Sequence, residues 1–509
     1  MNRVTKKGTS VLLVCAMTVG MTACQSETAT APETSTEANV SAEVAVDGKE
    51  GVDTITVNGT PVVYVTTPDE MYKYVRQSED AVKVYDASEL DDTTGWVIPV
   101  DPDAKMQTID GWGSSLTDAS AINLSMLSEE ERSEVLHNLF DKDTGIGLNM
   151  LRQPLGCSDF SVEYGSYDEV DGDEDLSHFS IDYDKQYIIP YIKEALEIGD
   201  DMTVISSVWT PPLWMKTIPE YWSKNGSSLK RENYQLFSDY IVKALQAYED
   251  EGVHISYLSP QNEPSAQMTI PSCLYDTDSY STLINRYLKP TMEANGITTG
   301  LIGWDFNHFD PALDFISSTY DNIDIIAFHL YYQNWDMQKE FHQYFPDKPI
   351  WMTESSNRQV SGYTTYIGEM KRIATSLRSY ASAYFIFNIM LDEEGGPGQA
   401  IDFSNPAGLI QYNRETGQVS YQIDFYALGH YSKFIRKGAV ILDTVDTGAD
   451  NEGNIQNIVA LNENGAMTAV LTNGDTEAQT FKFVVGDKVV EYTVPARSGA
   501  TITWDANTY

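Results

Sequence analysis

Two glutamates each follow an apolar run and stand where a pair of carboxylates could do chemistry. Glu263 lies in the stretch SPQNEPSAQ, directly behind Asn262, and Glu354 lies in WMTESS. If these runs are the fourth and seventh strands of an eight-stranded parallel barrel, the two glutamates face each other across its mouth. Two facing carboxylates suit glycoside hydrolysis, because one protonates the leaving oxygen while the anomeric carbon is attacked from the other side. The alternative is that each Glu simply ends a strand in solvent.

The elements that would position this pair alternate in type along the chain. Eight short apolar, strand-like runs occupy residues 109–116, 147–154, 202–209, 254–261, 300–305, 323–331, 349–355 and 383–390. Seven helical patterns lie between them, at 128–140, 185–199, 233–252, 280–296, 311–320, 338–345 and 364–380. The first opens with Ser128 and Glu131 at the spacing of a capping box. Near-continuous apolar strands are typical of a parallel sheet buried on both faces, and eight of them indicate a closed (β/α)8 barrel.

The chain beyond the barrel has a different pattern. Short alternating runs near the C-terminus are separated by Asn-Glu-Asn-Gly, Asn-Gly-Asp and Gly-Asp, which are hairpin signals. We therefore predict an α/β protein with a catalytic TIM barrel at 108–430 and an appended antiparallel β-sandwich at 431–509. Strands within 52–107 are expected to contribute to the sandwich from the N-terminal side.

The first residues have the features of an export signal. Arg3, Lys6 and Lys7 precede a short apolar run, and small residues then lead to Cys24 in MTAC. This arrangement resembles the bacterial lipobox, in which the Cys is lipidated and becomes the new N-terminus; an ordinary secretory signal is the alternative. We predict a lipoprotein signal peptide at 1–24 and a disordered acidic linker at 25–51. The protein is then expected outside the cytoplasm, on a bacterial cell surface, anchored to the membrane by its lipid.

Charge and cysteine content narrow the possible partners. The net charge of −42 repels phosphates and argues against nucleic acid. Outside the signal only Cys157 and Cys273 remain, too few for a disulfide framework or a zinc cluster. No metal is expected, because His329 has no second His or Cys at ligand spacing, and no organic cofactor is implied. A carbohydrate or glycolipid substrate is the expected partner, and no protein partner is inferred.

Other predicted strand ends carry the groups of a sugar-binding site. They supply Asp118, Arg152, Trp209, His329 and Tyr331. A sugar-binding site needs such groups: carboxylates that bind sugar hydroxyls, an aromatic ring on which the sugar can stack, and hydrogen-bond donors. Their placement at the same end of several strands favours the catalytic interpretation of the two glutamates over the solvated one.

Several blocks of the chain resemble, in order, those of glycoside hydrolase family 30. They are TIDGWGSSLTDASAINL, GIGLNMLRQPLGCSDFS, SSVWTPPLWMK, NEPSAQ, HLYY, TESS, EEGGPG and GHYSKFI, and the resemblance runs from about Pro99 to the end. Within the family, the chain is similar to the glucosylceramidases and the endo-β-1,6-glucanases. The resemblance implies a (β/α)8 barrel fused to a side β-sandwich, and hydrolysis with retention of configuration through a covalent glycosyl-enzyme.

The resemblance also implies roles for the central residues. Glu263 looks like the general acid/base and Glu354 like the nucleophile, while Asn262 would bond the 2-hydroxyl, a contact that strengthens in the transition state. Physical chemistry supports this division of labour. Glu263 needs a raised pKa from burial or from the charge of Glu354, whereas Glu354 must be held ionised by donors.

The remaining positions carried over by the resemblance surround the same sugar. Asp118 would hold sugar hydroxyls, Trp209 would lie beside the same ring, and Tyr331 would lie close to the nucleophile. The chain departs from the animal glucosylceramidases on its last barrel strand, where Phe387 is the aromatic position that is kept. Downstream, Asp402 replaces an Asn near the site entrance. These departures concern the leaving-group side, and hence ceramide versus glucan.

Taken together, these features predict a retaining β-glycosidase acting on β-glucosides of the glucosylceramide type. Endo-β-1,6-glucanase is the first alternative, and β-xylosidase or another family 30 specificity is the second. From a different class, the chain could be a surface glycan-binding lipoprotein that keeps the barrel without the chemistry. The presence of both Glu263 and Glu354 argues against that last possibility, because a pure binder does not need the pair.

Overall fold

The computed structural model describes residues 61–67, 73–357, 363–399, 406–449 and 452–506. All of them lie within one compact unit. Several predictions fall outside these ranges: the signal peptide with Cys24, the linker at 25–51, the first part of the predicted N-terminal strands at 52–60 and the candidate Asp402.

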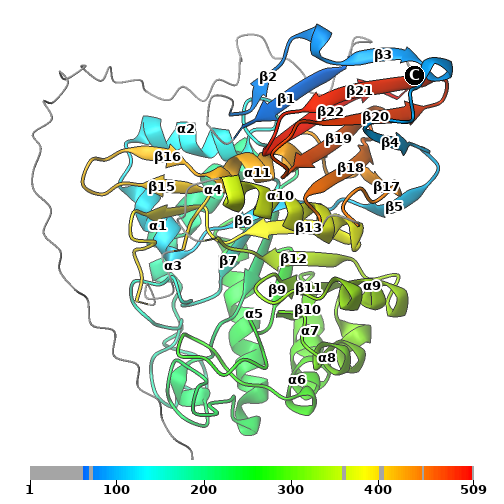
Figure 1. The fold of residues 1–509 in the computed structure, drawn as a ribbon. Helices are drawn as coiled ribbons and strands as arrows, with labels where there is room; N and C mark the ends of the chain where they lie inside the picture. Colours follow the sequence, from blue (N-terminus) through cyan, green and yellow to red (C-terminus); the bar gives the residue numbers. More distant parts are fainter. Residues whose placement is uncertain (1–60, 68–72, 358–362, 400–405, 450–451, 507–509) are drawn as a thin grey trace, which may run out of the picture. The chain divides into compact units, whose positions relative to one another are not determined.

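Eight parallel strands form a closed barrel in the order β10-β11-β12-β13-β6-β7-β8-β9 (Figure 1). They are β6 (Gly111–Ser115), β7 (Met150–Pro154), β8 (Thr203–Ser207), β9 (Tyr257–Ser259), β10 (Gly300–Phe306), β11 (Ile325–His329), β12 (Ile350–Glu354) and β13 (Ala381–Ile386). Each strand overlaps one of the eight predicted runs. The predicted (β/α)8 barrel is therefore confirmed.

Helices follow the barrel strands at each of the seven predicted patterns. They are α2 (Glu129–Phe140), α3 (Asp182–Tyr187), α4 (Ile189–Ile198), α5 (Tyr234–Asp250), α6 (Thr277–Leu283), the π-helical turn η5 (Ile284–Leu288), α7 (Lys289–Ala294), α8 (Ala312–Thr319), α9 (Trp335–Tyr344) and α10 (Tyr363–Arg378). The capping box is present, because Ser128 Oγ accepts the Glu131 N–H and Glu131 Oε2 accepts the Ser128 N–H.

Three elements were not predicted from the sequence. They are α1 (Asp118–Ser125), α11 (Ile423–Ser432) and a small sheet of β14 (Met390–Asp392), β15 (Ile410–Tyr412) and β16 (Val419–Tyr421). Residues 424–432 of α11 are all buried. A helix that is buried all round shows no polar face, so it lacks the period that identifies amphipathic helices.

The second structural layer is a sandwich of two sheets, built from both ends of the chain. One sheet has the order β2-β1-β22-β19-β18-β17-β5 and the other β3-β21-β20-β4. The strands are β1 (Val62–Thr66), β2 (Val75–Arg76), β3 (Lys83–Asp86), β4 (Trp96–Pro99), β5 (Lys105–Thr108), β17 (Val440–Leu442), β18 (Ile455–Leu461), β19 (Ala466–Asn473), β20 (Gln479–Val485), β21 (Lys488–Val494) and β22 (Ser498–Asp505). Pairing is antiparallel throughout except between β4 and β20.

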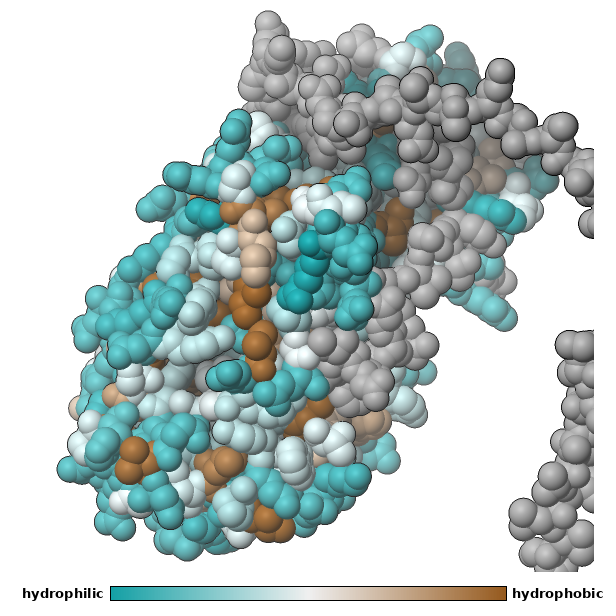
Figure 2. Space-filling model, turned by 90° about the vertical axis from the view of Figure 1, so that its left-hand side faces the viewer, coloured by the Kyte–Doolittle hydropathy of each residue, from teal (hydrophilic) through white to brown (hydrophobic). Residues whose placement is uncertain are grey.

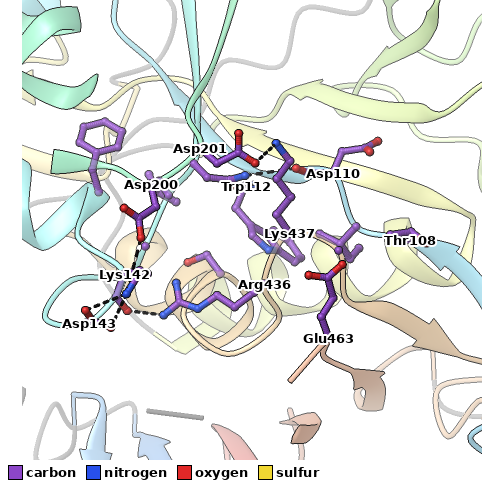
Figure 3. Close-up of a pocket in the computed structure, with 17 residues that line it drawn as sticks. Thr108, Asp110, Trp112, Lys142, Asp143, Asp200, Asp201, Arg436, Lys437 and Glu463 are labelled. Atoms are coloured by element: carbon purple, nitrogen blue, oxygen red, sulfur yellow. Dashed lines mark hydrogen bonds and ion pairs between the residues drawn. The ribbon is translucent and has the colours of Figure 1, made fainter. Parts of the chain in front are cut away.

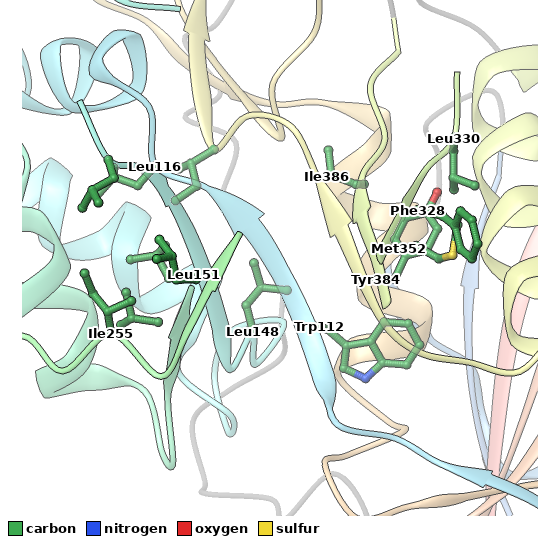
Figure 4. Close-up of a cluster of buried hydrophobic side chains, with 14 of the residues drawn as sticks. Trp112, Leu116, Leu148, Leu151, Ile255, Phe328, Leu330, Met352, Tyr384 and Ile386 are labelled. Atoms are coloured by element: carbon green, nitrogen blue, oxygen red, sulfur yellow. The ribbon is translucent and has the colours of Figure 1, made fainter. Parts of the chain in front are cut away.

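Side chains along the barrel strands alternate between the barrel interior and the layer between the strands and the helices. Met150, Ile205 and Phe385 belong to a small interior cluster, whereas Leu151 and Met352 belong to the large cluster of buried side chains between the strands and the helices (Figure 4). Because side chains fill the interior, a binding site is confined to the ends of the strands.

One face of the molecule shows how hydrophilic and hydrophobic residues are distributed on the surface. The face in Figure 2 is mostly hydrophilic, with hydrophobic residues in small groups and one short row. Over the described ranges, no helix has both the length and the apolar character needed to cross a bilayer.

Candidate active site

The two predicted glutamates meet at the C-terminal end of the barrel. Glu354 is the last residue of β12, and Glu263 lies beyond the end of β9 with a left-handed φ of 52°. Glu263 is 4% exposed and Glu354 is 6% exposed, so neither is a solvated loop carboxylate. His329, the last residue of β11, lies between them. Its Nδ1 is 3.0 Å from Glu263 Oε1 and its Nε2 is 3.8 Å from Glu354 Oε2.

Donors surround the carboxylate of Glu354. Arg152 Nη1 donates to Glu354 Oε2 at 2.7 Å, and the Tyr331 hydroxyl donates to Glu354 Oε1 at 2.8 Å. Arg152 also donates through Nη2 to Asn262 Oδ1 at 2.7 Å. Both oxygens of Glu354 thus accept hydrogen bonds, which stabilises its negative charge. The same guanidinium fixes the position of Asn262 beside Glu263.

A residue that the sequence analysis did not select, Asp305, connects the cations of the site. It is completely buried and accepts hydrogen bonds from Arg152 Nη2 at 3.3 Å, His329 Nε2 at 3.2 Å and Thr353 Oγ1 at 2.6 Å. Asp305 has a φ of 49°, and the pairing of β10 with β11 shifts register there. This bulge turns the carboxylate into the barrel mouth.

The arrangement sets the protonation states of the central groups. Burial raises the pKa of Glu263, and the charges of Glu354 and Asp305 raise it further, against the opposing effect of His329. Burial alone would lower the pKa of His329, but the charge of Glu354 and the hydrogen bonds to Asp305 and Glu263 outweigh it and raise the pKa to about 10. Burial opposes ionisation of Asp305, yet Arg152 and His329 hold its pKa well below its usual range. His329 is therefore an imidazolium near neutral pH.

The predicted aromatic residues form a wall next to these groups. The rings of Trp209 and Phe387 are stacked at 6.2 Å between centroids, and the Arg152 guanidinium lies 4.9 Å from the Trp209 ring. Both rings are 2% exposed. They hold the charged side chain of Arg152 in place as well as bordering the mouth.

Two aspartates, Asp118 and Asp159, differ in how their carboxylates are engaged. The oxygens of Asp118 accept the Tyr183 hydroxyl at 2.6 Å and the Val162 N–H at 2.8 Å, so both are engaged by the protein itself. Asp159, by contrast, has a buried Oδ1 for which no partner lies among the described residues. Burial, together with the charges of Glu354 and Glu263, raises the pKa of Asp159 to about 8. The sequence signal for Asp159 was its place in GCSDFS, a block of the resemblance.

A separate cavity of about 630 Å³ lies at the N-terminal ends of β6, β7 and β8 and contains none of the predicted site residues (Figure 3). Both of its lysines are in ion pairs, with Lys437 Nζ 2.6 Å from Asp201 and Lys142 Nζ 3.0 Å from Asp143. In the part of the chain that is described, no three His, Cys, Asp or Glu side chains are placed to hold a metal ion. The predicted site residues therefore lie apart from this cavity.

Comparison with known proteins gives matches over most of the chain. Residues 109–435 match the glycosyl hydrolase family 30 TIM-barrel domain, and residues 438–502 match the family 30 beta sandwich domain. Putative glucosylceramidase 4 of Caenorhabditis elegans is 27% identical, over 87% of each chain. An endo-1,6-beta-D-glucanase of Neurospora crassa is 25% identical, over 81% of this chain and 88% of its own. The crystal structure of SrfJ from Salmonella typhimurium has a TM-score of 0.80 at 24% identity and covers 87% of this chain and 99% of its own.

Proposed function

The chain belongs to glycosyl hydrolase family 30 and is a glycoside hydrolase, and we propose that it cleaves β-glucosides with retention of configuration. In this proposal Glu263 is the general acid/base and Glu354 is the nucleophile. The observation that carries it is a buried pair of glutamates in which one has a raised pKa and the other accepts hydrogen bonds from Arg152 and Tyr331.

The first step forms the covalent intermediate. A carboxylate oxygen of Glu354 attacks the anomeric carbon, the glycosidic bond breaks, and the proton of Glu263 passes to the departing oxygen. The Oδ1 of Asn262 is occupied by Arg152, so its amide N–H groups are the ones that meet the 2-hydroxyl. In the second step Glu263 removes a proton from water, which attacks the same carbon and releases Glu354.

Two substitutions test these assignments. We expect Glu354→Gln to abolish turnover. Glu263→Gln should slow the cleavage of substrates with poor leaving groups about 10²- to 10⁴-fold, the usual contribution of a general acid. A dinitrophenyl β-glucoside needs no acid, so the Glu263 variant should still form the intermediate from it, and azide should restore turnover. Full activity in either variant, or an initial product of the opposite anomeric configuration in the wild type, would contradict the proposal.

The proposed substrate is a β-glucoside of the glucosylceramide type, with a β-1,6-glucan as the alternative. Relatives named for each activity cover most of this chain at similar identity. Incubation with glucosylceramide in detergent and, separately, with a β-1,6-glucan distinguishes the two. Release of ceramide supports the first substrate, and release of gluco-oligosaccharides supports the second.

We also propose that the protein acts at a bacterial cell surface, held by a lipid on Cys24. The support is the sequence around that residue, MTAC after a charged and an apolar segment. Mass analysis of the mature N-terminus tests it: a diacylglyceryl Cys24 supports the anchor, and an unmodified start at another residue rejects it.

A further inference from the structure

Lys216 is a buried cation in the loop that follows β8, and it is 1% exposed. Its Nζ donates to Thr210 Oγ1 at 2.9 Å, Glu220 O at 2.6 Å, Ser272 O at 2.8 Å and, at a longer distance of 3.3 Å, Tyr221 O. The acceptors are three backbone carbonyls and one hydroxyl, so neutral oxygens enclose the positive charge. An ammonium is costly to bury unless its three N–H groups are hydrogen-bonded, and here each of them has an acceptor.

These contacts join two loops of the barrel mouth. Thr210 lies in the loop after β8, whereas Ser272 lies in the loop after β9, which carries Glu263. Ser223, also in the loop after β8, accepts no part of the charge but adds two links. Its N–H donates to Ser272 Oγ at 2.9 Å, and its hydroxyl donates to Ala266 O at 2.6 Å. The ammonium therefore stands at the centre of a junction between the two loops.

The loop after β9 needs such support because Glu263 has a left-handed φ of 52°. This conformation costs free energy in any residue other than Gly, and it persists only where the surroundings enforce it. The Ala266 N–H donates to Glu263 O at 3.0 Å. The Tyr275 N–H donates to Pro264 O at 2.7 Å and closes the loop that contains Ser272. A group that holds Ser272 thus fixes the far side of the loop whose near side is Glu263.

The inner parts of both loops have other supports. Asn262 N–H donates to Val208 O at 2.6 Å, and Gln261 Nε2 donates to Trp209 O at 2.7 Å. These contacts do not involve the ammonium, and Trp209 has no left-handed φ. Loss of the ammonium should therefore leave the aromatic wall in place. The backbone of Glu263 is the strained part of the junction, so it is the part expected to relax.

We propose that Lys216 is a positioning residue for the acid/base step, and that it holds the loop after β9 so that the carboxyl of Glu263 reaches the leaving oxygen. The inference rests on the proposed function, in which Glu263 is the acid. Lys216 is buried and its donors are all used, so it acts through the loop and not on the sugar.

The test compares two substrates that differ in their need for an acid. Lys216→Met removes the ammonium and keeps an unbranched side chain of similar length. A dinitrophenyl β-glucoside leaves without a proton, whereas a phenyl β-glucoside needs one. Because a displacement of about 1 Å can cost about 10²-fold, we expect kcat/KM to fall about ten- to a hundredfold on the phenyl glucoside and less than about threefold on the dinitrophenyl glucoside. Thr210→Val removes one acceptor only and should give a loss of about two- to fivefold, again confined to the phenyl glucoside.

Lys482→Met is the matched control. Lys482 is 4% exposed, and its Nζ likewise donates to backbone carbonyls, Asp91 O at 2.6 Å and Thr94 O at 2.9 Å. It lies on β20, in the sandwich. The same substitution there should leave the ratio of the two kcat/KM values unchanged, whatever it does to stability.

Several results would overturn the proposal. Equal losses on both glucosides in Lys216→Met would show a structural role only, and no loss on the phenyl glucoside would show no role at all. The same change of ratio in Lys482→Met would show that any buried lysine has this effect. If Lys216→Met does not fold, an unchanged ratio in Thr210→Val refutes the proposal.

Glu263→Gln, measured on the same two substrates, separates this inference from the proposed function. If its losses depend on the leaving group and those of Lys216→Met do not, only the role of Lys216 fails. If the losses of Glu263→Gln show no such dependence, the role of Glu263 as the acid fails as well.

Discussion

Asp305→Asn is the substitution that most directly tests how the site is held together. Asp305 is completely buried and is hydrogen-bonded to Arg152 and His329, both cations. Breaking a buried ion pair by removing one partner typically costs about 3–5 kcal/mol. The pKa of Asp305 lies well below its usual range, so its contribution is complete above pH ~4 and lost only in stronger acid. We therefore expect the free energy of unfolding at pH 7 to fall by about 3–5 kcal/mol.

Urea unfolding at pH 7, followed by tryptophan fluorescence, measures this loss. Asp314→Asn, an exposed carboxylate on α8, is the control and should stay within about 0.5 kcal/mol of the wild type. A double-mutant cycle with His329→Gln adds a second criterion. Residues in one buried network show coupling of about 0.5–3 kcal/mol. A loss below 1 kcal/mol for Asp305→Asn, or additivity of the two substitutions, would refute the idea that Asp305 holds His329 in its charged form.

Three further predictions concern His329, Asn357 and Cys24. His329→Gln should move the alkaline limb of the kcat/KM profile to higher pH, because the cation that lowers the pKa of Glu263 is gone; an unmoved limb would contradict this. Asn357→Ala should lower kcat and reduce the free energy of unfolding in urea by about 1–3 kcal/mol, since its amide joins the loop after Glu354 to buried carboxylates on α10 and α11; unchanged stability would contradict it. Cys24→Ser in the full chain should release the protein from the membrane fraction of the bacterium that expresses it, and continued membrane association would reject the anchor.

The barrel could be predicted because its signals are local. Strands buried on both faces are apolar throughout, helices between them are amphipathic, and Ser128 with Glu131 marks a helix start without any tertiary knowledge. The small sheet and α11 have no such signal. Every residue of α11 from Asp424 onward is buried, so neither a polar face nor a period is visible in the sequence.

The residues of the site differ in how closely the sequence could place them. Glu354 and His329 are the last residues of their strands and lie near the ends of the predicted runs, whereas Glu263 was selected although it lies beyond the end of β9. The side chain of Asp305 reaches the mouth because Asp305 has a left-handed φ and the strand pairing shifts register there. The two-residue alternation of a strand sequence predicts neither feature. Asp118 is the opposite case, because the sequence analysis selected it but could not predict its partners. Tyr183 and Val162 lie close to it in the fold and donate hydrogen bonds to both of its carboxylate oxygens.

In the proposed mechanism Glu263 serves first as an acid and then as a base, and the charges of the site suit both roles. Arg152 and His329 are cations, and they offset the carboxylates of Asp305 and Glu354. The pKa of Glu263 is raised partly by the charge of Glu354. In the covalent intermediate of that proposed mechanism, Glu354 is an ester and has lost its charge, so the pKa of Glu263 falls while His329 continues to lower it. A group that held its proton for the first step then gives it up and can activate water in the second.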